Sequence, residues 1–455
     1  MRDRHVRLLT VPDTRRPGLE LALADTPLNK PDELTWWDWT VFLLHTAAEI
    51  EHALLVQYLY AAYSLADTGF TGPRVPPEPG ALTRDWRLAI TGIAREEMAH
   101  LLTVQNLLRF IGGPLNLERE DFPFLAFLYP FPFALEPLTR DSLAKYVAAE
   151  MPAEPGQQPE VIAEIIRRAT GAAGGMPVNR VGQLYETLTG IFRDSSKLAD
   201  SDLRTDLPAV DQASPGDWHA PDQSPLIVRV IGSRDQAVLA LQDIGAQGEG
   251  SATVPSSHFD RFLAVYQAFP DTGTPAAPAD WVPARSVPAN PNTMHEPSGD
   301  PAVERGRITH STTRLWASLS NVRYRMLLAD LAHFLQLPGP LSDRNGAVTG
   351  RGHLRDWAFS EMVTGIRGIA QVLITLPLKE VPGPGDPDRA GPPFELPYTL
   401  ALPDDEHDRW RLHLALLDTS SSLISGIEAA SGPSSLLTRM KQSDLQARAI
   451  AAAQP

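Results

Sequence analysis

The chain has 455 residues, 43% hydrophobic and 21% charged, so it can bury sizeable cores and we expect two or three domains. Its formal net charge of −15 gives no support to a nucleic-acid or anionic-membrane partner. It has no cysteine, which excludes disulfides, thiolate metal sites, iron–sulfur clusters and a cysteine nucleophile.

Residues 1–34 contain basic residues but no apolar signal segment and no long periodic stretch, and we interpret them as an N-terminal arm. No apolar run in the chain is long enough to span a bilayer. We therefore expect a soluble cytoplasmic protein with no membrane partner.

From Trp37 to about Asp67 the sequence is apolar on nearly every face, which predicts a helix in the middle of a bundle. A buried carboxylate costs several kcal/mol unless it is paired or coordinated, so the acidic residues here need partners. The alternative is that Glu49 and Glu51 lie on an exposed strip. The polar residues of this stretch are His45, Glu49, Glu51, His52 and Gln57.

Residues 93–113 predict an amphipathic helix that stops at Gly112 and Gly113. Glu97 and His100 are three residues apart and so are neighbours on one helix face. A Glu-x-x-His pair that projects into a bundle is half of the ligand set of carboxylate-bridged di-iron proteins. The alternative is an exposed pair of polar neighbours.

The middle of the chain alternates loops and shorter helices. Residues 112–140 are rich in proline and aromatics and read as a crossover, followed by a short helix at 141–150 that ends before Pro152. A surface helix is predicted at 157–172. The segment 178–194 predicts a further helix, in which Glu186 lies beside an apolar stripe.

The next segment predicts an interrupted helix. A short β-like run at 226–230 precedes a helix from 235 that reaches Gly248, Glu249 and Gly250. The chain then breaks at Pro255, and a new helix carrying His258 follows, capped by Ser256 or Ser257.

Together these patterns predict a mostly α-helical chain. Residues 35–268 form a helical bundle, 269–308 a proline-rich linker or covering loop, and 309–455 a C-terminal helical region. That region contains helical patterns at 311–337, 352–377 and 408–430.

The acidic and imidazole residues of the bundle helices match the needs of a dinuclear site. Two helices offer one glutamate each, and the other two offer a glutamate and a histidine, which is the inventory of a bundle di-iron or di-manganese centre. Carboxylates suit these metals because they bridge two cations and offset their charge. The candidates are Glu51 or Glu49, Glu97, His100, Glu186, Glu249 and His258.

The sequence resembles the ferritin-like superfamily, and within it the iminophenyl-pyruvate dimer synthase type known from the violacein pathway. The similarity implies an antiparallel four-helix bundle with a long crossover and a dinuclear metal site. It is carried by EIEHALLVQYLYAAYS (49–64), REEMAHLLTVQNLLRFIGG (95–113), YVAAEMP (146–152), VGQLYETL (181–188) and QGEG with SSHFDRF (247–262).

The resemblance favours Glu51 as the first-helix ligand, because it precedes Tyr58 by seven residues as in ferritins. It also places Glu97, His100 and Glu186 at ligand positions. Glu249 and His258 are nine residues apart, so they reach one centre only if the helix breaks between them. Residues expected beside the ligands or in the pocket wall are Glu49, His52, Tyr58, Glu150, Tyr185 and Gln247.

We therefore expect an oxidase or oxygenase that uses two iron ions, with manganese or a mixed centre as alternatives. Its partners would be dioxygen and a small, amino-acid-derived substrate of secondary metabolism, with a homodimer as the assembly considered. Two other classes stay open: a ferritin-like protein that oxidises or stores iron, and a metal-free binding or assembly protein of the same fold.

Overall fold

The computed structural model describes residues 28–66, 79–119, 128–156, 159–218, 226–250, 256–270, 282–396 and 400–454. Most of the predicted N-terminal arm lies outside the described residues. Within them the chain is helical, with a few isolated bridges and no strand. None of the described helices combines the length and apolarity that membrane crossing needs.

The chain divides into two compact units. The first, called here the bundle unit, comprises Met1–Ala134, Leu138–Ala209 and Asp222–Pro283. The second, the C-terminal unit, comprises Leu135–Pro137, Val210–Pro221 and Ala284–Pro455.

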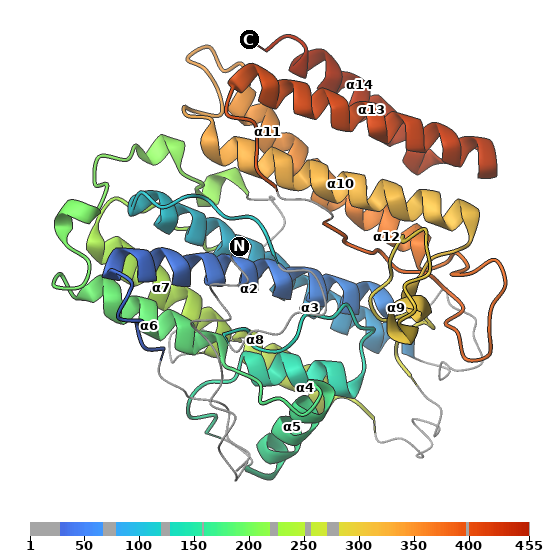
Figure 1. Ribbon diagram of the computed structural model, residues 1–455, viewed down its shortest axis with the longest axis horizontal. Coiled ribbons are helices and arrows are strands. Elements are labelled where there is room, and N and C mark those ends of the chain that lie inside the picture. Colours follow the sequence, from blue (N-terminus) through green and yellow to red (C-terminus); the bar gives the residue numbers. More distant parts are fainter. Residues whose placement is uncertain are drawn as a thin grey trace. The chain divides into compact units, whose positions relative to one another are not determined.

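Two long helices, α2 (Trp36–Ser64) and α3 (Pro79–Phe110), pack side by side in the bundle unit (Figure 1). The third member of the helical bundle is divided into two helices, α4 (Arg140–Ala149) and α6 (Val181–Arg193). The fourth member is divided into α7 (Arg234–Glu249) and α8 (His258–Gln267). Among these helices α6 packs on α7, α4 packs on α8, and α5 (Pro159–Ala172) packs on α4. The predicted all-α four-helix bundle is confirmed, with two continuous and two interrupted members.

Local sequence explains where these helices begin and end. Thr35 caps α2, with its side chain accepting a hydrogen bond from the Asp38 backbone. Gly250 follows α7 with φ +97°, a conformation that glycine adopts without strain, and Ser257 caps α8. The predicted break before His258 is therefore present.

The β-like run at 226–230 is not a strand. It lies along α3, and polar side chains of α3 form hydrogen bonds with its backbone. Thr103 accepts a hydrogen bond from the Arg229 backbone N–H (3.1 Å), and Asn106 donates one to the Arg229 carbonyl (2.8 Å). A buried extended segment needs such partners for its backbone, and here side chains supply them.

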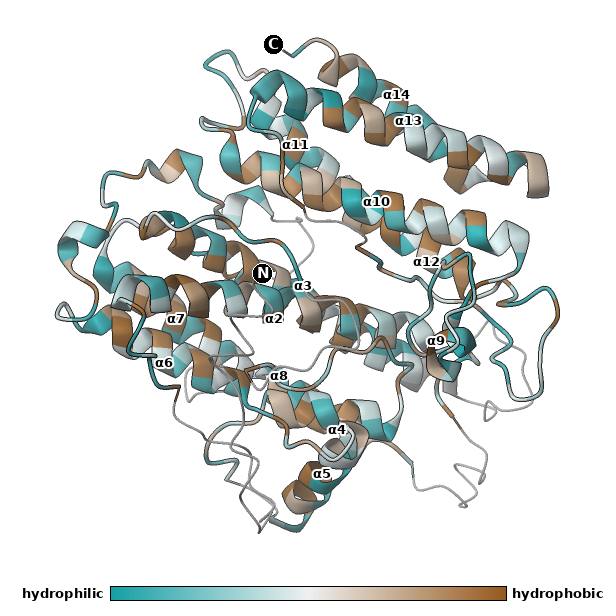
Figure 2. Ribbon diagram, viewed as in Figure 1, coloured by the Kyte–Doolittle hydropathy of each residue, from teal (hydrophilic) through white to brown (hydrophobic). Residues whose placement is uncertain are grey.

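The C-terminal unit is also helical. Polar and apolar residues are mixed along α10 and α13 (Figure 2). The helix α13 buries one face, whereas α10 is buried on every side from Met326 to Leu335. The helix α14 was not among the predicted helical patterns. The helices are α9 (Pro301–Gly306), α10 (Ser311–Gln336), α11 (Gly350–Ser360), the π-helical turn η4 (Glu361–Ile366), α12 (Arg367–Leu373), α13 (Glu406–Ser431) and α14 (Ser435–Ala451).

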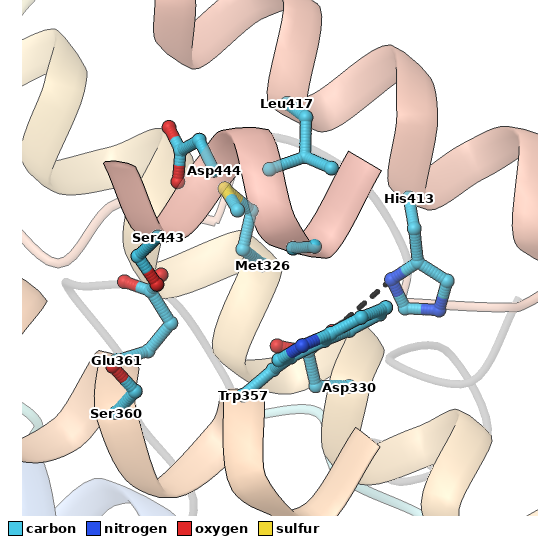
Figure 3. A pocket seen from close by; sticks show the side chains of 10 residues that line it. Met326, Asp330, Trp357, Ser360, Glu361, His413, Leu417, Ser443 and Asp444 are labelled. Atoms are coloured by element: carbon cyan, nitrogen blue, oxygen red, sulfur yellow. Dashed lines mark ion pairs between the residues drawn. The ribbon is translucent and has the colours of Figure 1, made fainter. Parts of the chain in front are cut away.

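A buried arginine ties these helices together. Arg323 on α10 is 1% exposed and donates to Glu361 Oε1 (2.7 Å), Asp444 Oδ1 (2.8 Å) and Ser420 Oγ (2.8 Å). Beside this network lies a small cavity of about 20 Å³, enough for one water. Figure 3 shows Glu361 and Asp444 on one side of it, and the ion pair of Asp330 with His413 on the other.

Glu361 is expected to make this unit sensitive to pH. Burial raises its pKa to about 7 against the opposing effect of Arg323, with Asp330 and Asp444 adding to the rise. Because the folded-state pKa lies above the ordinary 4.5, the stability that its proton contributes is present below pH 4.5 and is lost as the pH rises through 7.

Between pH 5 and pH 8 we therefore expect the free energy of unfolding of wild type to fall by about 2–3 kcal/mol relative to that of Glu361→Gln, whose side chain cannot ionise. Urea unfolding of both proteins at several pH values measures this difference. A constant difference across the range would contradict the prediction.

Candidate metal centre

Five buried side chains converge inside the bundle unit. Glu51 comes from α2, Glu97 and His100 from α3, Glu150 from the end of α4, and His258 from the first position of α8. His100 Nδ1 lies 3.3 Å from Glu51 Oε2 and 3.0 Å from Glu97 Oε2. His258 Nδ1 lies 3.1 Å from Glu97 Oε1 and 3.6 Å from Glu150 Oε2.

These side chains form two groups with one shared member. One group is Glu51, Glu97 and His100, and the other is Glu97, Glu150 and His258; in each, the candidate ligand atoms lie within 4.8 Å of one another. The two imidazole rings are 5.4 Å apart between centroids. Two cations could thus each take one histidine and one glutamate while Glu97 bridges them, as in bundle di-metal sites.

The hydrogen bonding of the cluster fits a metal. Glu51 Oε2, Glu97 Oε1 and His258 Nδ1 are buried atoms that make no hydrogen bond of good geometry with the described residues. An unsatisfied buried polar atom is costly, and each of these three residues belongs to at least one of the two groups. The donor set of carboxylate oxygen and imidazole nitrogen is also one that iron and manganese accept.

The charges of the cluster indicate that a cation belongs there. Burial opposes the charged form of His100, but Glu51 and Glu97 outweigh it and raise its pKa to about 10. Burial likewise opposes a charge on His258, yet Glu97, Glu150 and Glu96 hold its pKa well above the ordinary value. Burial, together with Glu97, raises the pKa of Glu51 to about 7. Protons on the histidines thus supply positive charge that a metal ion would supply instead.

Both interrupted helix pairs break at the level of the cluster. Glu150 follows the last residue of α4 and Glu249 is the last residue of α7, so two carboxylates lie at helix C-termini, where the helix dipole is unfavourable to them. His258 begins α8 and Val181 begins α6. The breaks therefore direct functional groups from helix ends toward one point.

A layer of hydrogen bonds orients the ligand candidates. Tyr58 donates to Glu150 Oε1 (2.7 Å), and Tyr185 donates to Glu51 Oε1. Gln247 Oε1 accepts from His100 Nε2 (2.9 Å). Such partners fix the orientation of metal ligands.

Sequence reasoning missed Glu96 as a partner in this layer. His258 Nε2 donates to Glu96 Oε2 (2.9 Å), and Glu96 also pairs with Arg261. The sequence contains an indication of this role. Glu96 adjoins Glu97, and a second acidic residue on a buried helix needs a partner of its own.

The structure does not bring Glu186 to the cluster. It is exposed on α6, because the neighbouring Tyr185 takes the inward position, and Glu150 occupies the place expected for it. Glu249 lies at the edge: it lines the same cavity as Glu51 and Glu97, but pairs with Arg180 (2.7 Å).

Glu49 and His52 are buried away from the cluster. Glu49 accepts hydrogen bonds from Asn116 (2.9 Å) and from the Tyr129 hydroxyl. His52 Nδ1 donates to the Leu117 carbonyl (2.9 Å), and burial, assisted by Arg119, lowers its pKa to about 3, so it is neutral. Both residues fasten α2 to the segment after α3.

Comparison with known proteins shows which sequences this chain is similar to. Residues 44–267 match the family model described as Ferritin-like. Dichlorochromopyrrolate synthase from Lentzea aerocolonigenes is 28% identical over 391 residues, 78% of this chain and 35% of that protein. The 2-imino-3-(indol-3-yl)propanoate dimerase of Chromobacterium violaceum is 27% identical over 397 residues, 80% of this chain and 34% of that protein.

The chain thus spans about a third of the length of these two relatives. Among solved structures, a ferritin-like protein from Caulobacter vibrioides is similar with a TM-score of 0.38 and 17% identity, over 72% of this chain and 94% of that one.

Proposed function

Because the bundle segment of this chain belongs to the ferritin-like family, we propose that its buried cluster holds a dinuclear centre of the di-iron type and that the protein is an oxidoreductase. The observation that carries the proposal is the pair of ligand groups that share Glu97. A single-metal site has no need of two histidines, one beside each oxygen of the same carboxylate.

In this proposal each residue of the cluster has a defined role. Glu51 and His100 would hold one ion, Glu150 and His258 would hold the other, and Glu97 would be shared by both. Glu249 is a further carboxylate that lines the same cavity. When bound, a centre of this kind supplies redox chemistry with dioxygen.

The surrounding side chains orient the ligands and exclude water. Tyr58 holds Glu150 by its hydroxyl while its ring packs edge-on against Tyr146 and Phe262, each at 4.8 Å between centroids. Tyr185 holds Glu51 from the opposite helix. These aromatic rings exclude bulk water from one side of the cluster, which strengthens electrostatic interactions within it.

The proposed substrate is a small amino-acid derivative. One relative is named as a dichlorochromopyrrolate synthase, and the other as a dimerase of 2-imino-3-(indol-3-yl)propanoate, an indole-bearing imino acid. We extend that substrate class, an α-imino or α-amino acid, to this chain by analogy.

The decisive experiment combines metal content with dioxygen uptake. We expect about two iron ions per chain after anaerobic loading, and uptake of dioxygen that depends on an added imino acid generated from tryptophan by an amino-acid oxidase. Iron oxidation that needs no organic substrate would favour storage or detoxification instead. Failure to take up iron or manganese would leave a binding or assembly role.

A further inference from the structure

A groove of about 320 Å³ runs between α6 and α7 in the bundle unit. This volume is in the range of small-molecule sites. Glu186, Thr189 and Arg193 line it from α6, and Gln242 and Gly245 line it from α7. Neither the cluster of ligand candidates nor the relatives account for it.

The groove shares a wall with the cavity at the candidate metal centre. Gly182, Tyr185, Gly245 and Glu249 line both spaces. Two of these four residues are glycines, so Tyr185 and Glu249 contribute the only side chains of this shared wall, called here the opening. The groove therefore adjoins the cavity at the cluster.

Gly182 makes room for Glu249 at this opening. A Cβ atom at Gly182 would collide with the Glu249 carboxylate, which packs directly on the α6 backbone and is held there by Arg180 (2.7 Å). At Gly245, in contrast, a Cβ atom would lie 3.9 Å from Tyr185 Cβ, an ordinary contact. A methyl group can thus be added at Gly245 without disturbing the helix pair.

The groove offers charges of both signs. Glu186 and Arg193 lie seven residues apart on α6, so they share one face of the helix about 10 Å apart along its axis. Neither forms an ion pair within the described part of the chain. A ligand with a carboxylate and a nitrogen cation could neutralise both.

We propose that this groove is the docking site and access path of the substrate, with Arg193 binding the substrate carboxylate. The nitrogen-bearing end faces Glu186 and Glu249 at the inner end, and Glu249, held aside by Arg180, forms the gate to the centre. The assignment rests on the proposed function for the identity of the centre, and its tests separate the two.

The first test measures access to the metal. Iron should leave the loaded protein to 2,2′-bipyridyl at least about ten times more slowly in Gly245→Leu, which fills the opening, than in wild type. Gly245→Ala should stay within about twofold of wild type. The matched control is Gly190→Leu, an exposed glycine of α6 with open space around it and outside the groove. Equal rates in Gly245→Leu and Gly190→Leu, at equal iron content, would overturn the access path.

The second test needs no metal. L-tryptophan binding to the metal-free protein, measured by calorimetry, should weaken about tenfold in Arg193→Gln and be largely kept in Arg193→Lys. Tryptamine, which lacks the carboxylate, should bind wild type and Arg193→Gln alike.

Equal weakening for tryptamine, or no weakening for tryptophan, would overturn the role of Arg193. Absence of tryptophan binding to wild type up to about 10 mM would overturn the docking site. A protein that binds tryptophan in the groove but takes up no metal would instead contradict the proposed function alone.

Discussion

Replacing Glu97 by alanine is expected to remove both metal ions, from about two per chain to below about 0.2. Glu97 is the only member common to the two ligand groups, and its removal leaves each prospective metal with one glutamate and one histidine from the chain. Glu51→Ala, which affects one group only, should lose about one ion. Elemental analysis of protein loaded anaerobically and then desalted measures both.

Glu186→Ala is the informative control for this experiment. The resemblance placed Glu186 among the ligands, whereas the structure leaves it exposed on α6, with no part in either group. We expect this variant to keep its metal. If Glu186→Ala lost iron as Glu97→Ala does, the ligand set drawn from the geometry would be wrong and that drawn from the resemblance right.

Arg323→Met is expected to destabilise the C-terminal unit by about 3–5 kcal/mol at pH 7. The methionine fills similar space but leaves Glu361 and Asp444 buried without their counter-charge. The loss should shrink toward pH 5, because Glu361, whose pKa is raised by burial, can then take up a proton. Urea unfolding, followed by the transition of this unit, measures the change.

A compensating variant tests whether Arg323 stabilises the unit through its charge. Arg323→Met combined with Glu361→Gln and Asp444→Asn removes the buried charges together, so most of the lost stability should return. If the triple variant were as unstable as Arg323→Met alone, the arginine would act through packing rather than charge.

The sequence by itself determined the helices and one half of the centre. Long apolar periodicity predicts α2 and α3. Gly250 and Pro255 predict the break between α7 and α8, with Ser256 or Ser257 as the cap, because capping and backbone preferences are local. Glu97 and His100 must lie side by side since residues three apart share a helix face. The C-terminal helix α14 was missed because its many polar residues weaken the periodic signal.

Only the tertiary structure decided which other residues join Glu97 and His100. Glu49 and Glu51 are both buried on α2, but two residues apart they face about 200° apart, so packing alone sends Glu51 to the centre and Glu49 to Asn116. The partners of Arg323 are 38 and 121 residues away in sequence.

Tertiary structure also decides which carboxylate joins Glu51 and Glu97 at the centre. Glu150 and Glu186 both follow apolar helical turns, and their sequences do not distinguish them. Glu150 reaches the cluster because α4 packs on α8 and ends there, whereas the turn of α6 gives the inward position to Tyr185. Local sequence sets which face of a helix is apolar, but the point where two interrupted helices end together depends on contacts between residues far apart in the chain.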